Sequence, residues 1–385
     1  METPLFDSFW MAGFEGACHV NRHGTRLDML AATQHDRQAE ADYARLREFG
    51  IRVARDGVRW HLVDRGGRYD FSSFAPMLAA AQRQGIQVIW TLCHYGFPDD
   101  LELLDPRFVE RFAAYCRAVA EFVAAHSDRA PSYTPVNEIS FLAWAGNTGY
   151  IYPQYYGRGP ELKRQLVRAA IAGMNAILEV DPRARFIHVD PIYHVVPPRG
   201  RPDLEDRALA QIASQYEAWD MIAGRRDQDL GGDPRYLDVI GVNFYHANEW
   251  EWPGEGPDDR LRWEDTPRDA RWVPLHQLIA KTYRRYQRPI LIAETSHFGV
   301  GRGPWISEIA DEVLLALEAG VPLEGVCIYP IIDRPDWDDP NHWHNSGLWD
   351  LIPDERGELR RVLSEPYAEA LRAAQQRVQT TRAAA

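Results

Sequence analysis

Residues 74–93, FAPMLAAAQRQGIQVIWTLC, show the pattern that decides the fold. Apolar side chains recur at helical spacing between Phe74 and Gln84. Gly85 follows, a residue that often ends a helix because it adopts positive φ without steric cost. Residues 88–93 are then apolar with β-branched members, as in a buried strand. A helix followed at once by a buried strand is the repeating unit of an α/β protein.

The same unit repeats along the whole chain, and we expect eight short apolar strands with helical segments between them. The predicted strands are residues 9–17, 51–54, 88–93, 132–136, 185–189, 237–244, 290–293 and 325–329. The predicted helices are residues 39–49, 74–84, 107–126, 162–180, 204–223, 276–286, 306–319 and 365–377. Eight repeats predict a parallel (β/α)8 barrel, with an active site at the C-terminal ends of its strands.

The length of 385 residues suits one catalytic barrel domain that spans residues 1–385 and carries insertions. No Pro/Gly/Ser-rich linker divides it, and we expect residues 378–385 to form a loose, disordered tail. No apolar window approaches roughly 18 residues, so no membrane span is expected. The N-terminus has no basic region followed by an apolar stretch, which favours a cytoplasmic location.

The net charge of −13 argues against nucleic acid or an anionic membrane surface as a partner. The four cysteines (Cys18, Cys93, Cys116 and Cys327) are scattered without metal-ligand spacing. Three of them lie in apolar strand-like runs, where a free thiol packs as a small hydrophobe. A reduced chain is therefore expected.

Two glutamates follow predicted strands. Glu138 ends the segment Tyr133-Thr134-Pro135-Val136-Asn137-Glu138, and Glu294 follows Ile290-Leu291-Ile292-Ala293. Glutamate is disfavoured in strands, so its presence at two equivalent positions calls for a reason. A retaining glycosidase uses such a pair, with one carboxyl to protonate the leaving oxygen and one carboxylate to attack the anomeric carbon. Charged residues also occur at barrel rims without a catalytic role, so the pair alone leaves both interpretations open.

Further polar and aromatic residues stand at the predicted strand ends. They are Arg55, His94, Asn137, Asn243, Tyr245, Asp333 and Trp337. In a (β/α)8 barrel all of these side chains converge on one mouth. The stability of a barrel does not require polar and aromatic side chains to converge at one mouth. Their convergence therefore favours a catalytic site.

Several of these segments resemble glycoside hydrolase family 1, strand by strand and over nearly the whole chain. The similar segments are residues 55–60, 91–98, 137–138, 241–245 (Gly-x-Asn-x-Tyr), 293–294, 333–337, 347–351 and 359–361. The chain therefore resembles a divergent member of this family, within the wider clan A of retaining barrel glycosidases.

The resemblance implies hydrolysis of β-linked glycosides by double displacement, without a cofactor. Glu138 would be the acid/base and Glu294 the nucleophile, with the two carboxyl groups about 5 Å apart. Glu138 must start protonated, so we expect its environment to raise its pKa, while Glu294 must stay ionised.

The resemblance also implies a substrate-binding set around the two carboxyl groups. Arg55 and Tyr245 would hold and stabilise Glu294. Asn137 would bind the 2-hydroxyl of the sugar and His94 a ring hydroxyl. Trp337 would pack against the C–H face of the sugar. Asn243, from the sixth-strand segment, belongs to the same set.

The chain departs from the family pattern at four places. His19 stands where the family has a Gln that grips two sugar hydroxyls, and Asp336 replaces a Glu in the loop after strand eight. Tyr95-Gly96 replaces Trp-Asp, and Ile139 replaces Pro. We include His19 and Asp336 among the expected substrate-binding residues. The catalytic pair is kept while the hydroxyl-binding residues differ, so the sugar stays open.

Three alternatives remain beside a β-glycosidase. Residues 299–303 (Gly-Val-Gly-Arg-Gly) precede a helix where barrels often bind phosphate, which suits a 6-phospho-β-glycosidase, although the acidic loop at residues 333–339 opposes it. The others are a transglycosidase and a non-catalytic carbohydrate-binding barrel. His342, His344 and the aspartates of residues 333–339 lack the spacing of zinc or calcium sites, so no metal is expected.

An insertion at residues 248–272 contains four tryptophans and several acidic residues just after the sixth strand. It forms either part of the aglycone side of the cleft or a loop packed on the barrel by its own aromatics. The expected substrate is a small-molecule or oligosaccharide β-glycoside. Its sugar and aglycone, and the oligomeric state, are left open.

Overall fold

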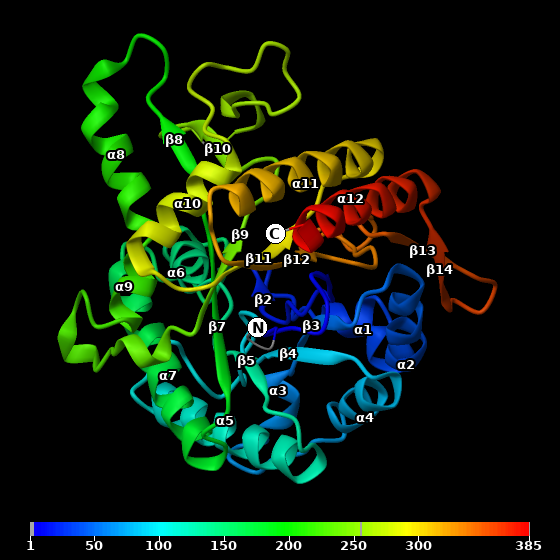
Figure 1. Cartoon of the computed structure of the whole chain (residues 1–385). Coiled ribbons are helices and arrows are strands. Elements are labelled where there is room, and N and C mark those ends of the chain that lie inside the picture. The colour runs from blue at the N-terminus through cyan, green and yellow to red at the C-terminus, as the bar shows by residue number, and fades with distance from the viewer. Residues whose placement is uncertain (1–3, 255, 385) are drawn as a thin grey trace.

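The computed structural model describes residues 4–254 and 256–384, and its centre is a closed barrel of eight parallel strands (Figure 1). The barrel strands are β1 (Trp10–Gly13), β3 (Val53–Gly57), β4 (Gln87–Thr91), β5 (Ser132–Thr134), β7 (Arg185–Pro191), β9 (Val239–Asn243), β11 (Ile290–Thr295) and β12 (Leu323–Ile328). Strand β1 pairs with both β3 and β12, which closes the sheet. The predicted (β/α)8 barrel is therefore confirmed.

Helices surround the barrel and bury their apolar faces against it. They are α1 (Met29–Ala32), α2 (His35–Leu46), α3 (Trp60–Val63), α4 (Ala75–Gln84), α5 (Arg107–His126), α6 (Ile139–Thr148), α7 (Gly159–Val180), α8 (Glu205–Ser214), α9 (Glu217–Ile222), α10 (Leu275–Tyr286), α11 (Arg302–Glu318) and α12 (Glu365–Ala384). In α5, for example, Phe108, Phe112 and Tyr115 are buried, a spacing that places them on one helical face. Within the described residues, no helix is both long and apolar enough to cross a membrane.

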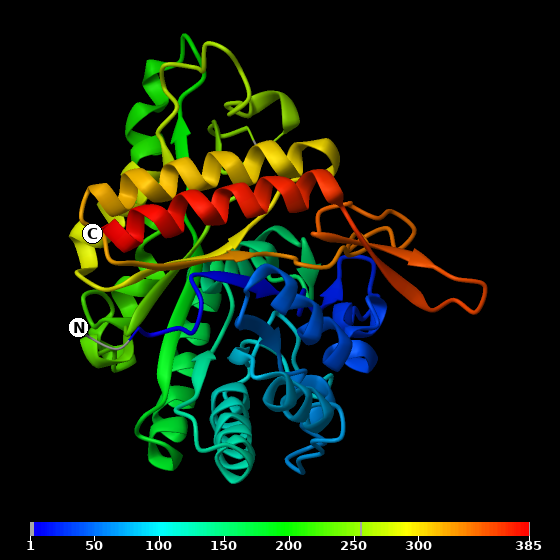
Figure 2. The same ribbon diagram turned by 45° about the vertical axis from the view of Figure 1, so that its right-hand side comes forward.

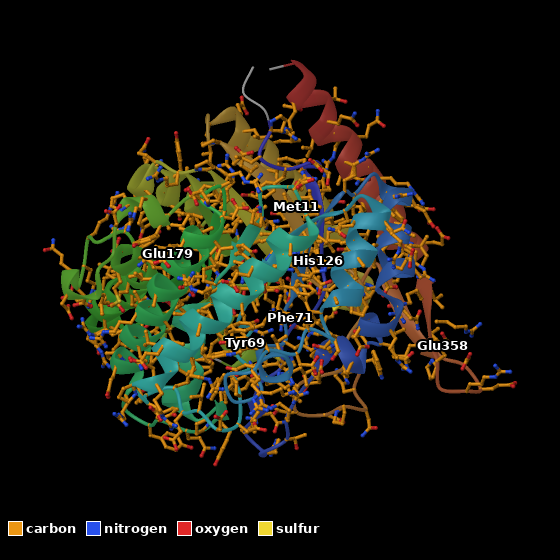
Figure 3. All side chains as sticks on the ribbon, turned by 90° about the horizontal axis from the view of Figure 1, so that it is seen from below. Met11, Tyr69, Phe71, His126, Glu179 and Glu358 are labelled. Atoms are coloured by element: carbon orange, nitrogen blue, oxygen red, sulfur yellow. The ribbon has the colours of Figure 1, made fainter. Side chains whose placement is uncertain are left out.

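Three small sheets lie outside the barrel. Strand β2 (Val20–Asn21) pairs with β6 (Ile151–Tyr152), and β8 (His194–Val196) pairs with β10 (Glu249–Glu251). Strands β13 (Trp349–Pro353) and β14 (Leu359–Leu363) form a hairpin that projects from the body, with Glu358 near its tip (Figures 2 and 3). We call residues 192–214, 248–254 and 256–274 the protrusion, since β8, α8, β10 and their loops extend beyond the barrel (Figure 1).

The barrel interior is filled by side chains that alternate along the strands. Met11, Val53, Ile89, Ile187, Leu291 and Cys327 belong to one buried cluster. Successive strand residues face opposite sides of a sheet, so Arg55 shares the inward direction of Val53, one layer nearer the C-terminal mouth. The polar layer of the site thus rests on a packed apolar layer. Cys18, Cys93, Cys116 and Cys327 are buried free thiols.

Two predictions about helices differ from the structure. Residues 204–223 form two helices, α8 and α9, because the chain leaves the helix around Gln215 and Tyr216. The loose tail predicted for residues 378–385 is wrong as far as residue 384, since α12 continues to Ala384 and runs beside α11 (Figure 2). Leu371, Ala374 and Val378 lie on one face of α12 and are buried, which anchors the helix as far as Val378. Ala385 lies outside the described residues.

Candidate active site

Glu294 lies where β11 loses its regular register. Leu291 and Ala293 belong to the interior cluster, so strict alternation would aim Glu294 away from the barrel axis. The register with β9 shifts between Ile292 and Glu294, and the register with β12 shifts between Ile292 and Thr295. Such an irregularity re-aims a side chain, and it places the Glu294 carboxylate against Arg55 in the mouth of the barrel.

The Glu294 carboxylate is held from two sides. Arg55 Nη1 donates to Oε1 at 3.1 Å, and the Tyr245 hydroxyl donates to Oε2 at 2.8 Å. Arg55 is 1% exposed and also donates to the Ala293 carbonyl and to Asn137 Oδ1. Burial disfavours the guanidinium charge, but the surrounding groups, Glu294 first among them, together outweigh burial and raise the pKa of Arg55. Arg55 and Glu294 therefore form a buried ion pair in the mouth of the barrel.

Glu138 occupies a different environment. It precedes α6 with a φ of 45°, a left-handed conformation that is uncommon for a residue other than glycine, and its N–H donates to the Val189 carbonyl. Asn243 Nδ2 donates to its Oε1 at 2.8 Å, and the Tyr95 hydroxyl donates to its Oε2. Burial, and then the Glu294 charge, raise the pKa of Glu138 to about 8. Glu138 is therefore set up to carry a proton at neutral pH.

Asn137 connects the surroundings of the two carboxyl groups. Its Oδ1 accepts from Arg55 at 2.9 Å, and its Nδ2 lies 3.2 Å from the Tyr95 hydroxyl and 3.3 Å from His94 Nε2. His94 Nδ1 lies 3.2 Å from the Tyr329 hydroxyl. Burial, and then the Arg55 charge, lower the pKa of His94 well below its ordinary value, so its imidazole is neutral. The site is thus one hydrogen-bonded network.

Aromatic rings stand beside this network. The Trp337 ring lies 4.8 Å from the His19 ring and 5.8 Å from the Tyr95 ring, and Asn21 holds the Trp337 carbonyl at 2.9 Å. His19 Nδ1 and Asn243 Oδ1 are buried atoms with no hydrogen-bond partner in the described part of the chain. Buried polar atoms are nearly always paired, so these two are available to a ligand.

The structure therefore brings together nine of the ten predicted site residues. They are Glu138, Glu294, Arg55, His94, Asn137, Asn243, Tyr245, Trp337 and His19. Asp336 is placed differently. Its Oδ1 accepts from the backbone of Asp338 and Asp339, and its Oδ2 lies 3.0 Å from His344 Nε2. Both of its carboxylate oxygens are thus engaged within their own loop.

A third buried carboxyl group belongs to the site and was not predicted. Glu15 is 5% exposed, with Oε2 3.1 Å from Arg334 Nε and Oε1 3.6 Å from His94 Nε2. The Tyr329 hydroxyl donates to Oε1 at 3.5 Å. Burial raises the pKa of Glu15, while Arg334 opposes the rise. The one signal in the sequence was an acidic residue inside the apolar run of residues 9–17.

Other candidate ligand sites from the sequence are occupied by internal contacts. Arg302, in the glycine-rich residues 299–303, donates to Asp350 Oδ1 and to the Gly347 carbonyl, both at 2.7 Å. His344 pairs with Asp336. Among residues 4–254 and 256–384, no three His, Cys, Asp or Glu side chains are arranged to hold a metal ion.

Solved structures share the fold of this barrel. A family 1 β-glucosidase from Thermotoga maritima superposes with a TM-score of 0.73 at 14% identity, covering 97% of this chain and 98% of that one. The AHE enzyme from Alicyclobacillus herbarius superposes with a TM-score of 0.74 at 15% identity, covering 99% of each chain. No protein-family model matches the sequence, and no curated protein does. The chain thus has the fold of the family 1 β-glucosidases over nearly its whole length, as the predicted resemblance implied.

Proposed function

We propose that this chain is a retaining β-glycosidase, with Glu138 as acid/base and Glu294 as nucleophile. One observation carries the proposal: two buried glutamates, one after β5 and one in β11, lie at the same mouth of the barrel in opposite environments. Glu138 is surrounded by neutral hydrogen-bond donors and has its pKa raised to about 8, whereas Glu294 faces the Arg55 guanidinium. Opposed environments of this kind separate the acid from the nucleophile in glycosidases.

In the first step, a Glu294 oxygen attacks the anomeric carbon while Glu138 transfers its proton to the glycosidic oxygen. The bond between the anomeric carbon and that oxygen breaks, the aglycone leaves as an alcohol, and the sugar becomes an ester of Glu294. In the second step, ionised Glu138 takes a proton from water. The resulting hydroxyl group attacks the anomeric carbon, and the Glu294 carboxylate leaves.

The surrounding residues stabilise the charges that these steps create. Arg55 and Tyr245 position the attacking Glu294 carboxylate. They also stabilise its negative charge when it leaves the sugar in the second step. The Asn137 amide, held by Arg55, is positioned to bind the 2-hydroxyl, a contact that strengthens as the sugar acquires oxocarbenium character. Neutral His94, His19 and the Trp337 ring complete the pocket for the sugar, and Asp336 remains a proposed rim contact. The complex of the T. maritima β-glucosidase with glucoimidazole supports a small glycoside as the ligand.

A panel of activated aryl β-glycosides tests this function, with gluco, galacto, fuco, manno, xylo, glucurono and 6-phospho members. We expect turnover of one or two members and its loss in Glu294→Ala. Adding alcohols as acceptors and analysing the products separates hydrolysis from transglycosylation. If no member of the panel is hydrolysed but sugars raise the melting temperature, the non-catalytic carbohydrate-binding alternative is favoured.

A further inference from the structure

A cavity of about 560 Å³ lies beside the candidate active site. Five of its lining residues belong to α6, which follows Glu138: Ser140, Phe141, Ala143, Trp144 and Asn147. The others come from the start of α7, from α8 and α9, and from the segments that follow β7 and β9. The elements of the protrusion stand on the same side of the barrel as α6 (Figure 1).

The cavity adjoins the acid/base through the first turn of α6. The Phe141 ring lines the cavity, and its centroid lies 5.3 Å from the Tyr95 ring and 6.3 Å from the Trp337 ring. Ser140 also lines it, and its N–H and hydroxyl donate to Asp190 at 3.0 and 2.9 Å. The contacts that orient the start of α6 behind Glu138 therefore also shape this cavity.

The position of the cavity indicates which part of a substrate it meets. Its lining residues lie at or after the ends of β5, β7 and β9, and none comes from β11 or from the segments after β1 and β12, where Glu294, His19 and Trp337 lie. In a retaining site the nucleophile and the acid/base address opposite sides of the scissile bond, and the leaving group extends past the acid. The cavity is therefore on the leaving-group side.

The lining is mostly apolar and aromatic. Phe141 and Trp144 have ring centroids 5.6 Å apart, as Tyr193 and Trp250 do at 5.2 Å, and Trp144 remains 37% exposed. The Trp250 indole N–H is buried without an acceptor in the described part of the chain. Flat apolar groups stack well on such rings, and the free N–H suits one ligand oxygen. The volume falls within the roughly 300–1,000 Å³ of cavities that hold drug-sized ligands.

The charged residues that line the cavity do not favour an ionic ligand. Lys163 Nζ and Glu217 Oε2 pair at 2.8 Å, and Arg260 is exposed. A second sugar needs many hydroxyl partners, whereas this lining offers scattered amides such as Asn147, Gln211 and Asn248. Of the Trp-rich insertion, Trp250 lines the cavity, while Trp263 packs 5.1 Å from Trp305. Different tryptophans of that insertion thus line the cavity or pack on the barrel.

We propose that this cavity binds the aglycone, and that the natural substrate is a β-glycoside of an uncharged, flat alcohol or phenol with more than one ring, rather than of another sugar. The inference rests on the proposed function, since an aglycone exists only if the glycosidic bond is cleaved here.

The test compares kcat/KM for three glycosides of the sugar that the panel identifies: a phenyl glycoside, a fused multi-ring phenol glycoside of similar leaving-group acidity, and a β-linked disaccharide. We expect the multi-ring substrate to be preferred at least tenfold over the other two. In Trp144→Ala that preference should fall about tenfold, chiefly through KM. Trp252→Ala is the matched control, because Trp252 belongs to the protrusion but stacks under Arg207 and does not line the cavity.

Calorimetry of the unaltered chain with the free multi-ring phenol gives a second measurement that depends neither on turnover nor on a variant. We expect saturable binding, weakened in Trp144→Ala. If the phenol binds but no glycoside of the panel is cleaved, the proposed function fails while the cavity remains a site for this ligand class. If glycosides are cleaved with a preference for the disaccharide, or with no dependence on ring number and no binding of the phenol, the cavity proposal is wrong and the function stands.

Discussion

The Tyr95 hydroxyl donates a hydrogen bond to Glu138 Oε2, and it accepts one from Asn137 Nδ2 at 3.2 Å. Tyr95 and Glu138 both have positive φ, at 68° and 45°, so two residues in strained backbone conformations meet at the proposed acid/base. Tyr95 is also one of the positions at which the chain departs from the family 1 pattern. We infer that Tyr95 positions the Glu138 carboxyl and stabilises its ionised form.

Tyr95→Phe keeps the ring and removes this hydrogen bond. The Tyr95 contact lowers the pKa of Glu138, opposing the effect of burial, so its loss should raise that pKa further above about 8. The alkaline limb of kcat/KM, where Glu138 loses its proton, should therefore move up by about one pH unit. Release of the glycosyl group, which requires ionised Glu138, should slow at neutral pH. An unchanged pH profile would assign Tyr95 a purely structural role.

Arg55 and Glu294 should depend on each other for stability. Arg55→Gln leaves a buried carboxylate without its cation, and we expect a loss of about 3–5 kcal/mol in unfolding free energy together with a loss of activity. Glu294→Gln in the same chain removes that stranded charge, so the double variant should be more stable than Arg55→Gln alone. Denaturant unfolding of all four chains measures the coupling. Additive losses would show that the ion pair contributes nothing to stability.

His35 links helix α2 to the barrel through two aspartates. Its ring nitrogens lie 2.9 Å from Asp42 and 2.8 Å from Asp56, and Arg361 also pairs with Asp42 at 2.7 Å. Burial disfavours the charged ring, but Asp56 and Asp42 raise the pKa of His35 to about 9. A raised pKa gives stability that is fully present below pH 6.5 and is lost as the pH rises through 9.

The unfolding free energies of the unaltered chain and of His35→Gln should therefore differ most at pH 6. The difference should shrink by about 3 kcal/mol toward pH 9.5. His126→Gln, an exposed histidine given the same substitution, is the control and should show no such trend. A pH-independent difference would mean that His35 is neutral in the folded chain.

Glu249 should also make stability fall as the pH rises, but by destabilising the folded chain at high pH rather than by stabilising it at low pH. It is fully buried, its Oε2 accepts from the Val273 N–H at 2.9 Å, and burial raises its pKa to about 9. A carboxyl with a raised pKa keeps its proton in the folded chain while the unfolded chain ionises, so this residue lowers stability progressively from about pH 4.5 to 9. Glu249→Gln should gain stability relative to the unaltered chain, by up to about 1.4 kcal/mol per pH unit across that window. Glu205→Gln, on the exposed side of α8, is the control. Its unfolding free energy should differ from that of the unaltered chain by the same amount at every pH.

The sequence predicted the barrel because each repeat is locally unambiguous. The helix at Arg107–His126 was predicted with the bounds that it has, and every barrel strand was found within a few residues. Glu138 and Glu294 could be singled out because a glutamate after a buried strand conflicts with its surroundings, and their catalytic roles stay a prediction. The expected separation of about 5 Å between the two carboxyl groups stays a prediction.

What the sequence missed depends on contacts between distant residues. Glu15 and Arg334 are far apart in the chain, and only closure of the barrel between β1 and β12 brings them together. The register shift at Glu294 leaves no local signal. The continuation of α12 depends on the packing of Val378, which a count of helix-forming residues could not reveal. The cytoplasmic location, the single domain and the absence of a cofactor, of nucleic acid and of a membrane partner stay predictions.

Covalent trapping of Glu294 tests the central claim most directly. The chain is incubated with an activated 2-deoxy-2-fluoro β-glycoside of the sugar that the panel identifies, and its intact mass and proteolytic peptides are measured by mass spectrometry. The fluorine slows the second step more than the leaving group slows the first, so the glycosyl-enzyme accumulates. We predict an increase of one fluoroglycosyl group, located on Glu294 and absent from Glu294→Gln. A label on another residue, or an unlabelled chain that still hydrolyses the parent glycoside, would contradict the account.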